Sequence, residues 1–348
     1  MKPQTRQLHV GSVAIGGGAP CSVQSMCSTD TRDIAATMAQ IHALAEVGCE
    51  IVRCAVPDAD AADALAAIKA QSPIPVIADI HFDYKLALRV LEGGIDGLRL
   101  NPGNIGEHWK VAEVVRSAAE RRVPIRIGVN AGSLEKPLLE KYGHPTAEAM
   151  VESALGHIRI LEDLKYQEIK ISLKASDVPK TVAAYRLLSR QVEYPLHIGI
   201  TEAGTTFSGT IKSSVGLGIL LHDGIGDTLR VSLTGDPVDE VRVGYEILKS
   251  LGLRQRGVNF VSCPTCGRCQ INLIKVAEEV ERRLQSVHKQ ITVAVMGCAV
   301  NGPGEAREAD VGVAGGNGEG LIFRKGEIVR KVSEDKLADA LLEEINKL

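Results

Sequence analysis

Short hydrophobic runs alternate with longer stretches of helical periodicity along most of the chain. Each run has the length and β-branched content of a strand, and a polar turn and an amphipathic segment follow it. The runs lie at 22–26, 51–55, 76–80, 97–100, 125–129, 169–173, 196–200 and 229–233. The clearest helical segments lie at 34–47, 59–70, 109–121 and 238–251. Eight strand–helix repeats predict an α/β fold of the TIM (β/α)8 barrel type.

A doubly wound open sheet would show the same alternation. We prefer the barrel because no GxGxxG fingerprint follows the first strand. The alternation stops at 252–257, a segment that has the composition of a linker. We therefore predict a barrel domain over 1–254 and a small α+β domain over 255–348. The elements expected in the second domain are a strand at 259–262, a helix at 271–286, a strand at 291–296, short strands through 332 and a helix at 335–348.

Polar residues alternate with hydrophobic ones inside the predicted strands. Because one face of each strand must pack against the helices, the polar face must line the barrel interior. Six cations share that face: Arg53, Arg99, Arg126, Lys170, Lys174 and Arg230. The pattern places one acid there, Asp79. Unpaired buried cations are costly, so the excess favours an anionic ligand such as a phosphate ester, with an internal salt-bridge network as the alternative.

Functional side chains also gather where the strands end. The candidates are His81, Asp83, Asn101, Asn130 and Ser232. Glu202 follows the seventh strand and is a candidate proton donor or acceptor, although a carboxylate that caps a helix or pairs with an arginine is an equal alternative. Lys212 lies in the run GTIKSS at 209–214, which we expect to open a helix and to suit a phosphate.

Composition narrows the function classes. The net charge is −3 and aromatic residues make up 3% of the chain, which argues against nucleic-acid binding. No stretch approaches the ~20 apolar residues of a membrane span, and the first residues lack the apolar core of a signal peptide. We therefore expect a cytoplasmic protein, in which the eight cysteines are free thiols or metal ligands.

The sharpest single motif is the run Cys263, Cys266 and Cys269, followed at a distance by Cys298. C-x-x-C spacing brings two thiolates to one metal, and the spacing alone leaves an iron–sulfur cluster, a structural zinc and a redox dithiol open. Glu305 follows Cys298 after a glycine-containing turn and is a candidate labile oxygen ligand, with a surface carboxylate as the alternative. The other cysteines, Cys21, Cys27, Cys49 and Cys54, are expected to be small buried hydrophobic residues.

Taken together, these motifs resemble the 4-hydroxy-3-methylbut-2-enyl diphosphate synthases of the methylerythritol phosphate pathway, in their two-domain bacterial form. The resemblance covers essentially the whole chain. The matching segments are SM at 25–26, VRCAVP at 52–57, ADIHFD at 78–83, RLNPGN at 99–104, RIGVN at 126–130, SLKASD at 172–177, TEAG at 201–204, CPTC at 263–266 and GCAVNGPGEA at 297–306.

The resemblance implies an enzyme that reductively opens 2-C-methyl-D-erythritol 2,4-cyclodiphosphate with two electrons from a [4Fe-4S] cluster. It implies that Cys263, Cys266, Cys298 and Glu305 hold the cluster and that Glu202 handles a proton. It also implies that the diphosphate is held by Arg53, Arg99, Arg126, Asn130, Lys174 and Lys212, with His81 and Asp83 nearby. From their positions on or after the strands, we expect Asp79, Asn101, Arg230 and Ser232 to bind substrate as well. The resemblance also implies a homodimer and a flavodoxin or ferredoxin as electron donor.

One residue departs from the family pattern. Cys269 makes a C-x-x-C-x-x-C run like that of a ferredoxin, and without the resemblance it would be as good a fourth ligand as Glu305. We interpret Cys269 as a bystander thiol. Two other readings stay open on the residues alone: a phosphate-substrate barrel, such as one that binds a pterin, with a structural zinc module, and a zinc-stabilised binding protein.

Overall fold

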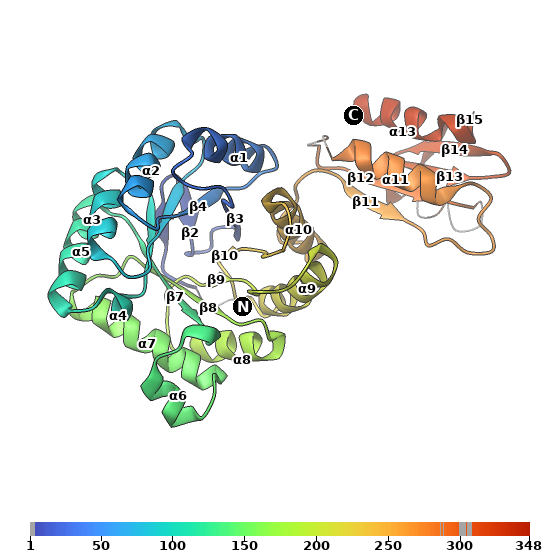
Figure 1. Ribbon diagram of the computed structural model, residues 1–348. Helices are drawn as coiled ribbons and strands as arrows, with labels where there is room; N and C mark the ends of the chain where they lie inside the picture. The colour runs from blue at the N-terminus through green and yellow to red at the C-terminus, as the bar shows by residue number, and fades with distance from the viewer. Residues whose placement is uncertain (1–3, 286, 288, 299–303, 305–307) are drawn as a thin grey trace. The chain divides into compact units, whose positions relative to one another are not determined.

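The structure of the chain is a computed structural model, shown in Figure 1. It describes residues 4–285, 287, 289–298, 304 and 308–348. The chain divides into two compact units, Met1–Arg254 and Gln255–Leu348. Each unit has its own hydrophobic core, and each is described by itself.

The first unit is a TIM barrel, which confirms the predicted fold class. Eight parallel strands follow the order β8-β7-β6-β5-β4-β3-β10-β9, and a bridge between Ile171 and Leu196 brings β8 beside β9. The sheet therefore closes into a ring, which the helices surround in Figure 1. The strands are β3 (Ser22–Met26), β4 (Ile51–Ala55), β5 (Val76–Asp79), β6 (Gly97–Arg99), β7 (Ile125–Asn130), β8 (Ile169–Lys174), β9 (His197–Ile198) and β10 (Thr228–Leu229).

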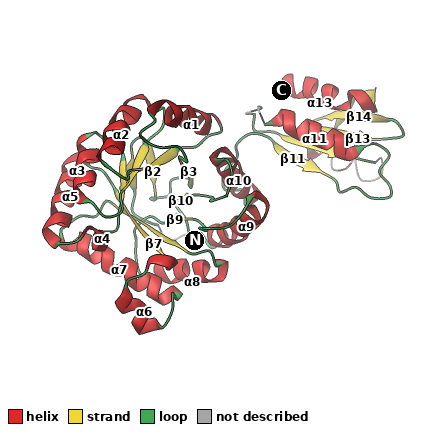
Figure 2. Ribbon diagram, viewed as in Figure 1, coloured by secondary structure: helices red, strands yellow, loops and turns green. Residues whose placement is uncertain are grey.

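Aspartate caps start five of the barrel helices. The carboxylates of Asp33, Asp58, Asp83, Asp177 and Asp236 each accept a hydrogen bond from a backbone N–H of the first turn. The helices, drawn red in Figure 2, are α1 (Ile34–Glu46), α2 (Ala59–Gln71), α3 (Tyr84–Glu92), α4 (Pro102–Ile105), α5 (His108–Arg121), α6 (Lys136–Tyr142), α7 (Ala147–Asp163), α8 (Val178–Leu188), α9 (Thr206–His222) and α10 (Pro237–Ser250).

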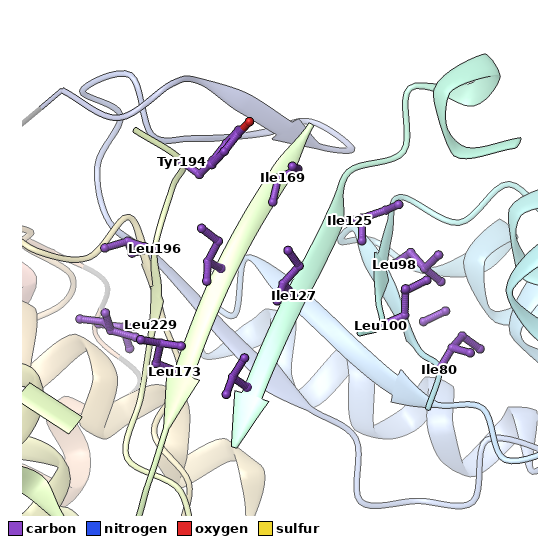
Figure 3. Close-up of a cluster of buried hydrophobic side chains, with 14 of the residues drawn as sticks. Ile80, Leu98, Leu100, Ile125, Ile127, Ile169, Leu173, Tyr194, Leu196 and Leu229 are labelled. Carbon is purple, nitrogen blue, oxygen red and sulfur yellow. The ribbon is translucent and has the colours of Figure 1, made fainter. Parts of the chain in front are cut away.

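The hydrophobic face of each strand packs against the helices. Figure 3 shows this layer, with Ile125 and Ile127 on β7 and Ile169 and Leu173 on β8. All four residues are fully buried in the main core of the barrel. Because side chains alternate along a strand, the residues between them point to the barrel axis.

Two strands are shorter than the sequence predicted. β9 ends at Ile198 and β10 at Leu229, whereas we expected 196–200 and 229–233. Just beyond these ends the Arg230 N–H donates to the Ile198 carbonyl at 3.0 Å, and further on the Thr234 N–H donates to the Gly204 carbonyl at 2.9 Å. Gly199 explains the irregularity, because its backbone approaches so closely that a Cβ there would lie 2.6 Å from the Arg230 carbonyl oxygen.

An N-terminal hairpin closes the amino end of the barrel. β1 (Leu8–Val10) pairs antiparallel with β2 (Val13–Ile15). Leu8, Val10 and Ile15 are buried, and they form one cluster with Ile51 and Ile77 at the start of β4 and β5. The amino end is therefore filled by hydrophobic side chains, and the polar interior lies between this cluster and the carboxyl ends of the strands, which we call the mouth.

The described residues of the second unit form a five-stranded mixed sheet with the helices α11 and α13. β11, β12 and β13 are parallel, and β14 and β15 continue the sheet antiparallel. Its core is made of the apolar faces of α11 and α13 and of the sheet. The elements are β11 (Asn259–Ser262), α11 (Leu273–Leu284), β12 (Thr292–Met296), β13 (Val311–Gly315), β14 (Glu319–Arg324), β15 (Glu327–Ser333) and α13 (Leu337–Asn346).

Candidate functional site

A polar layer fills the barrel between the hairpin and the mouth. The inward positions are buried although they carry polar or charged side chains, whereas TIM barrels usually fill this layer with Val, Ile and Leu. The buried members are Gln24, Arg53, Asp79, Arg99, Asn101, Arg126, Lys170, Ser172, Lys174 and His197. Burial on this scale predicts that the groups either neutralise one another or bind a ligand.

Asp79 neutralises part of the positive charge. Its carboxylate lies 3.5 Å from Arg53 Nε and 3.1 Å from Arg99 Nη1. Burial alone would raise the pKa of Asp79, but the charges of Arg53, Arg99 and Arg126 outweigh it and lower that pKa to about 2. Asp79 is therefore ionised, and it holds two guanidinium groups on the β4–β6 side of the barrel.

A second acid, which the strand pattern missed, balances Arg230. Glu240 lies on α10 and is 3% exposed, and its carboxylate is 3.3 Å from Arg230 Nη2. It also accepts hydrogen bonds from the Ser25 hydroxyl and the Leu233 N–H. The strand pattern could place only Asp79, because it considers residues on strands and Glu240 lies on a helix. The available signal was the helix pattern, which places Glu240 on the buried face with Gly244 and Leu248.

Three cations on β7 and β8 have no carboxylate partner among the residues that the structure describes. Arg126, Lys170 and Lys174 make no ion pair with any residue that the structure describes. Arg126 Nε and Nη1 and Lys170 Nζ also lack a hydrogen-bond partner. Burial, followed by the charges of neighbouring arginines, lowers the pKa of both lysines well below the usual value. The excess positive charge of the barrel is therefore concentrated at β7–β8.

Glycines at inward positions make room for these long side chains. A Cβ at Gly128 on β7 would lie 2.9 Å from Arg99 Nε, and a Cβ at Gly199 would lie 3.2 Å from Lys174 Nζ. Asn101 fixes the first of these positions, because its amide bonds both the N–H and the carbonyl of Gly128, at 2.8 and 2.9 Å. Asn101 thus already uses its amide in the structure, and substrate binding by it stays a prediction.

The remaining candidates lie at the mouth. His81 and Asp83 are exposed in the loop after β5, and Asp83 caps α3 through the Lys85 N–H. Asn130 and Ser232 are partly buried at the ends of β7 and of the segment after β10. The structure thus brings these four residues to the mouth, which is the solvent-facing end of the polar layer.

Lys212 does not lie where the sequence placed it. α9 begins at Thr206, so the run 209–214 lies inside the helix and does not open it; that expectation was wrong. The reason is Gly204, whose φ of +117° ends the loop one residue before the Thr205 cap. The Lys212 side chain is exposed on the second turn of α9.

Glu202 has an unusual backbone. It is exposed in the loop after β9, and its φ of +52° lies in the left-handed region, which is rare for a residue with a side chain. Among the described residues it forms no ion pair and caps no helix, so neither of its structural alternatives is observed. Strain of this kind often marks a functional position.

Cys263, Cys269 and Cys298 border one turn of the second unit. The Gly297 N–H donates to Cys263 Sγ at 3.2 Å, and a Cβ at Gly297 would lie 2.6 Å from Cys269 Sγ. Cys298 is the next residue and is buried, whereas Cys266 is exposed. Cys269 Sγ donates to the Ile271 carbonyl, and Glu305 lies outside the described residues. Glycine at 297 leaves space that a side chain would fill, and a thiolate set suits iron–sulfur ligation.

The described potential metal ligands, the cysteines of the second unit included, do not converge on one point in this structure. In the parts of the chain that the structure describes, no group of three or more His, Cys, Asp or Glu side chains lies close enough to hold a metal ion. Cys21, Cys27, Cys49 and Cys54 are buried in the barrel core, as predicted. Burial raises the pKa of Cys49 to about 12, so this thiol stays protonated. Every helix in the described ranges is too short or too polar to span a bilayer.

Comparison with known proteins covers both units. Residues 5–245 match the GcpE TIM-barrel domain, and residues 259–347 match the GcpE protein C-terminal domain. A protein of Geobacter sulfurreducens named 4-hydroxy-3-methylbut-2-en-1-yl diphosphate synthase (flavodoxin) is 79% identical over 348 residues, covering 100% of this chain and 99% of its own. A protein of the same name from Thermodesulfovibrio yellowstonii is 61% identical over 344 residues, covering 99% of each chain.

Two solved structures align with about the length of the barrel. Dihydropteroate synthase of Yersinia pestis aligns with a TM-score of 0.51 at 10% identity, covering 71% of this chain and 98% of its own. 3-Dehydroquinate dehydratase of Geobacillus kaustophilus aligns with a TM-score of 0.50 at 15% identity, covering 72% and 99%. Such low identities show a common fold and nothing further.

Proposed function

Because this chain belongs to the GcpE family, we propose that it converts 2-C-methyl-D-erythritol 2,4-cyclodiphosphate into 4-hydroxy-3-methylbut-2-enyl diphosphate in isoprenoid precursor biosynthesis. It is an iron–sulfur oxidoreductase. The observation that carries the choice of substrate is the group of buried cations at β7–β8 without carboxylate partners, Arg126, Lys170 and Lys174. A dianionic substrate supplies the charge that this part of the barrel lacks.

The diphosphate binds at the mouth, above β6–β8. Arg126 and Lys174 are its main partners, since neither forms an ion pair with a carboxylate in the described part of the chain. Arg53, Arg99 and Arg230 contribute the remaining donors of their guanidinium groups, while Asp79 and Glu240 keep those groups in place. We assign the sugar hydroxyls and the remaining phosphate oxygens to Asn101, Asn130 and Ser232, and we expect His81, Asp83 and Lys212 to contact the substrate from the rim of the mouth.

Glu202 handles the proton that accompanies the loss of water. The reaction takes up two electrons, opens the cyclic diphosphate and releases one water molecule. An exposed carboxylate on a loop that follows a barrel strand has the position of a general acid or base. Its left-handed backbone holds the side chain in a direction that an ordinary loop conformation would not give.

The second unit holds the redox group. We assign a [4Fe-4S] cluster to Cys263, Cys266, Cys298 and Glu305, which would supply electrons one at a time and an iron site of Lewis-acid character. The Gly297 N–H bonds Cys263 Sγ, and hydrogen bonds of this kind stabilise a thiolate. The electron donor is flavodoxin, as the names of the relatives indicate, with ferredoxin as the alternative donor. A homodimer in the cytoplasm completes the proposal.

Metal analysis tests this function most directly. On protein purified without oxygen, we expect about four irons and four acid-labile sulfides per chain, a brown visible spectrum, and turnover of the cyclodiphosphate with reduced flavodoxin. Stoichiometric zinc in a colourless solution would instead support a phosphate-substrate barrel with a structural metal module. If the protein contains the cluster but does not convert the cyclodiphosphate, the iron–sulfur assignment stands and the proposed substrate is wrong.

Two cysteines three residues apart test the ligand set. Cys266→Ser should lose most of the iron and all turnover, because serine replaces a thiolate that belongs to the proposed ligands. Cys269→Ser is the matched control and should keep the wild-type iron content, since a hydroxyl preserves its hydrogen bond to the Ile271 carbonyl. Iron and sulfide per chain are the measurement. Loss of iron in Cys269→Ser with retention in Cys266→Ser would reverse the assignment.

A further inference from the structure

Met26 lies between two positively charged groups at the mouth. It is the last residue of β3, and its thioether sulfur is 2.9 Å from Arg53 Nη2 and 3.3 Å from Arg53 Nε. Arg230 Nη1 lies 3.8 Å from the same sulfur. A thioether is a weak hydrogen-bond acceptor with a polarisable electron cloud, so Met26 offers both guanidinium groups an uncharged partner.

The sulfur connects two ion-pair groups. On one side, Arg53 and Arg99 share Asp79. On the other side, Arg230 pairs with Glu240, which also accepts from the hydroxyl of Ser25, the neighbour of Met26. Each guanidinium group thus contacts one carboxylate, Asp79 for Arg53 and Glu240 for Arg230, and both groups also contact the Met26 sulfur.

Two guanidinium groups that approach one partner repel each other. Burial lowers the pKa of Arg53 to about 10, and the charge of Arg230 acts in the same direction. A carboxylate at position 26 would relieve the repulsion but would also neutralise the charge that an anionic ligand needs. A leucine would remove the acceptor that Arg53 Nη2 and Arg230 Nη1 share, while the contacts with Asp79 and Glu240 would remain. Methionine supplies an acceptor without adding negative charge.

We infer that Met26 is a positioning residue, which holds Arg53 and Arg230 side by side so that both can bind one anionic group of the substrate. The inference rests on the proposed function, because it concerns the same cyclic diphosphate. Phosphate oxygens are far stronger acceptors of guanidinium N–H bonds than a thioether. The substrate therefore replaces the sulfur at low cost, and it finds the two side chains already oriented.

The test compares Met26→Leu with Met26→Gln in the complete, cluster-containing enzyme. Leucine keeps the size of the side chain and removes the acceptor, whereas glutamine restores an acceptor through its carbonyl oxygen. Met38→Leu is the matched control, because Met38 is buried on α1 in the barrel core and is not one of the proposed substrate-binding residues. The measurements are KM and kcat for the cyclodiphosphate, its Kd by calorimetry, and the melting temperature.

For Met26→Leu we expect KM and Kd to rise roughly threefold to tenfold, the effect of about one lost net hydrogen bond, with kcat nearly unchanged. Met26→Gln should recover most of the affinity, and Met38→Leu should bind like the wild type. An unchanged Kd in Met26→Leu would reject the positioning role, and so would equal losses in Leu and Gln. Absence of cyclodiphosphate binding in the wild type would reject the proposed function itself.

Discussion

Replacing Glu202 by glutamine is expected to lower kcat by about 100-fold or more, the usual effect of removing a general acid or base. The substitution keeps the size and polarity of an exposed side chain that forms no ion pair among the described residues. KM for the cyclodiphosphate and the iron content should therefore change little. Steady-state kinetics with reduced flavodoxin measures the effect. A kcat within a few-fold of the wild type would remove Glu202 from the reaction.

A second variant separates the side chain from the backbone. Glu202→Gly removes the carboxylate and also relieves the left-handed conformation at φ +52°, so the free energy of unfolding should rise by up to about 1 kcal/mol. Activity should nevertheless fall as far as in Glu202→Gln. A Glu202→Gly variant that is more stable but inactive would show that the left-handed backbone of Glu202 costs stability and serves the reaction. A destabilised variant would indicate that the residue supports the loop.

Arg126→Met is expected to change stability and binding in opposite directions. Arg126 is buried, its Nε and Nη1 have no partner, and burial together with Arg53 lowers its pKa well below the usual value. Removing such a charge should raise the free energy of unfolding by about 1 kcal/mol or more. The same change should weaken cyclodiphosphate binding by about 10- to 100-fold, because a charged hydrogen-bonding partner is lost. Chemical denaturation and calorimetry measure the two effects.

Arg99→Met provides the contrast. Arg99 donates to Asp79, and its removal leaves that buried carboxylate with Arg53 as its remaining close ion-pair partner. We expect it to lower stability or leave it unchanged, while it also weakens binding. If both variants were stabilised to the same extent, pairing with a carboxylate would not be what distinguishes Arg99 from Arg126, and our division of the cations would be wrong. Wild-type affinity in Arg126→Met would place the diphosphate elsewhere.

The sequence was sufficient for those parts of the fold that depend on local periodicity. Six of the eight barrel strands, β3 to β8, lie within about one residue of the predicted ranges. The aspartates before the helices were equally readable as caps. β9 and β10 were overestimated because their ends depend on the close approach of Gly199 to Arg230, which is a contact between strands and leaves no periodic signal.

The sequence predicted only those site residues whose direction follows from the alternation of side chains along a strand. Arg126, Lys170 and Lys174 follow the period of two, so their inward direction could be predicted. Glu240 could not be found this way, since it reaches Arg230 from a helix. Met26 carries no charge, and its contact with Arg53 depends on side-chain geometry that no spacing encodes. Long-range partners of this kind need three-dimensional coordinates.

The N-terminal hairpin has a kinetic consequence. Leu8, Val10 and Ile15 fill the amino end of the barrel against Ile51 and Ile77, so that end offers no passage for a charged molecule. Substrate must enter and product must leave by the same opening, one after the other. The diphosphate product retains the anionic groups by which the substrate binds, and it must vacate the cations before another molecule arrives. Product should therefore inhibit competitively against substrate, and release from the barrel can limit the steady state even when electron supply is fast.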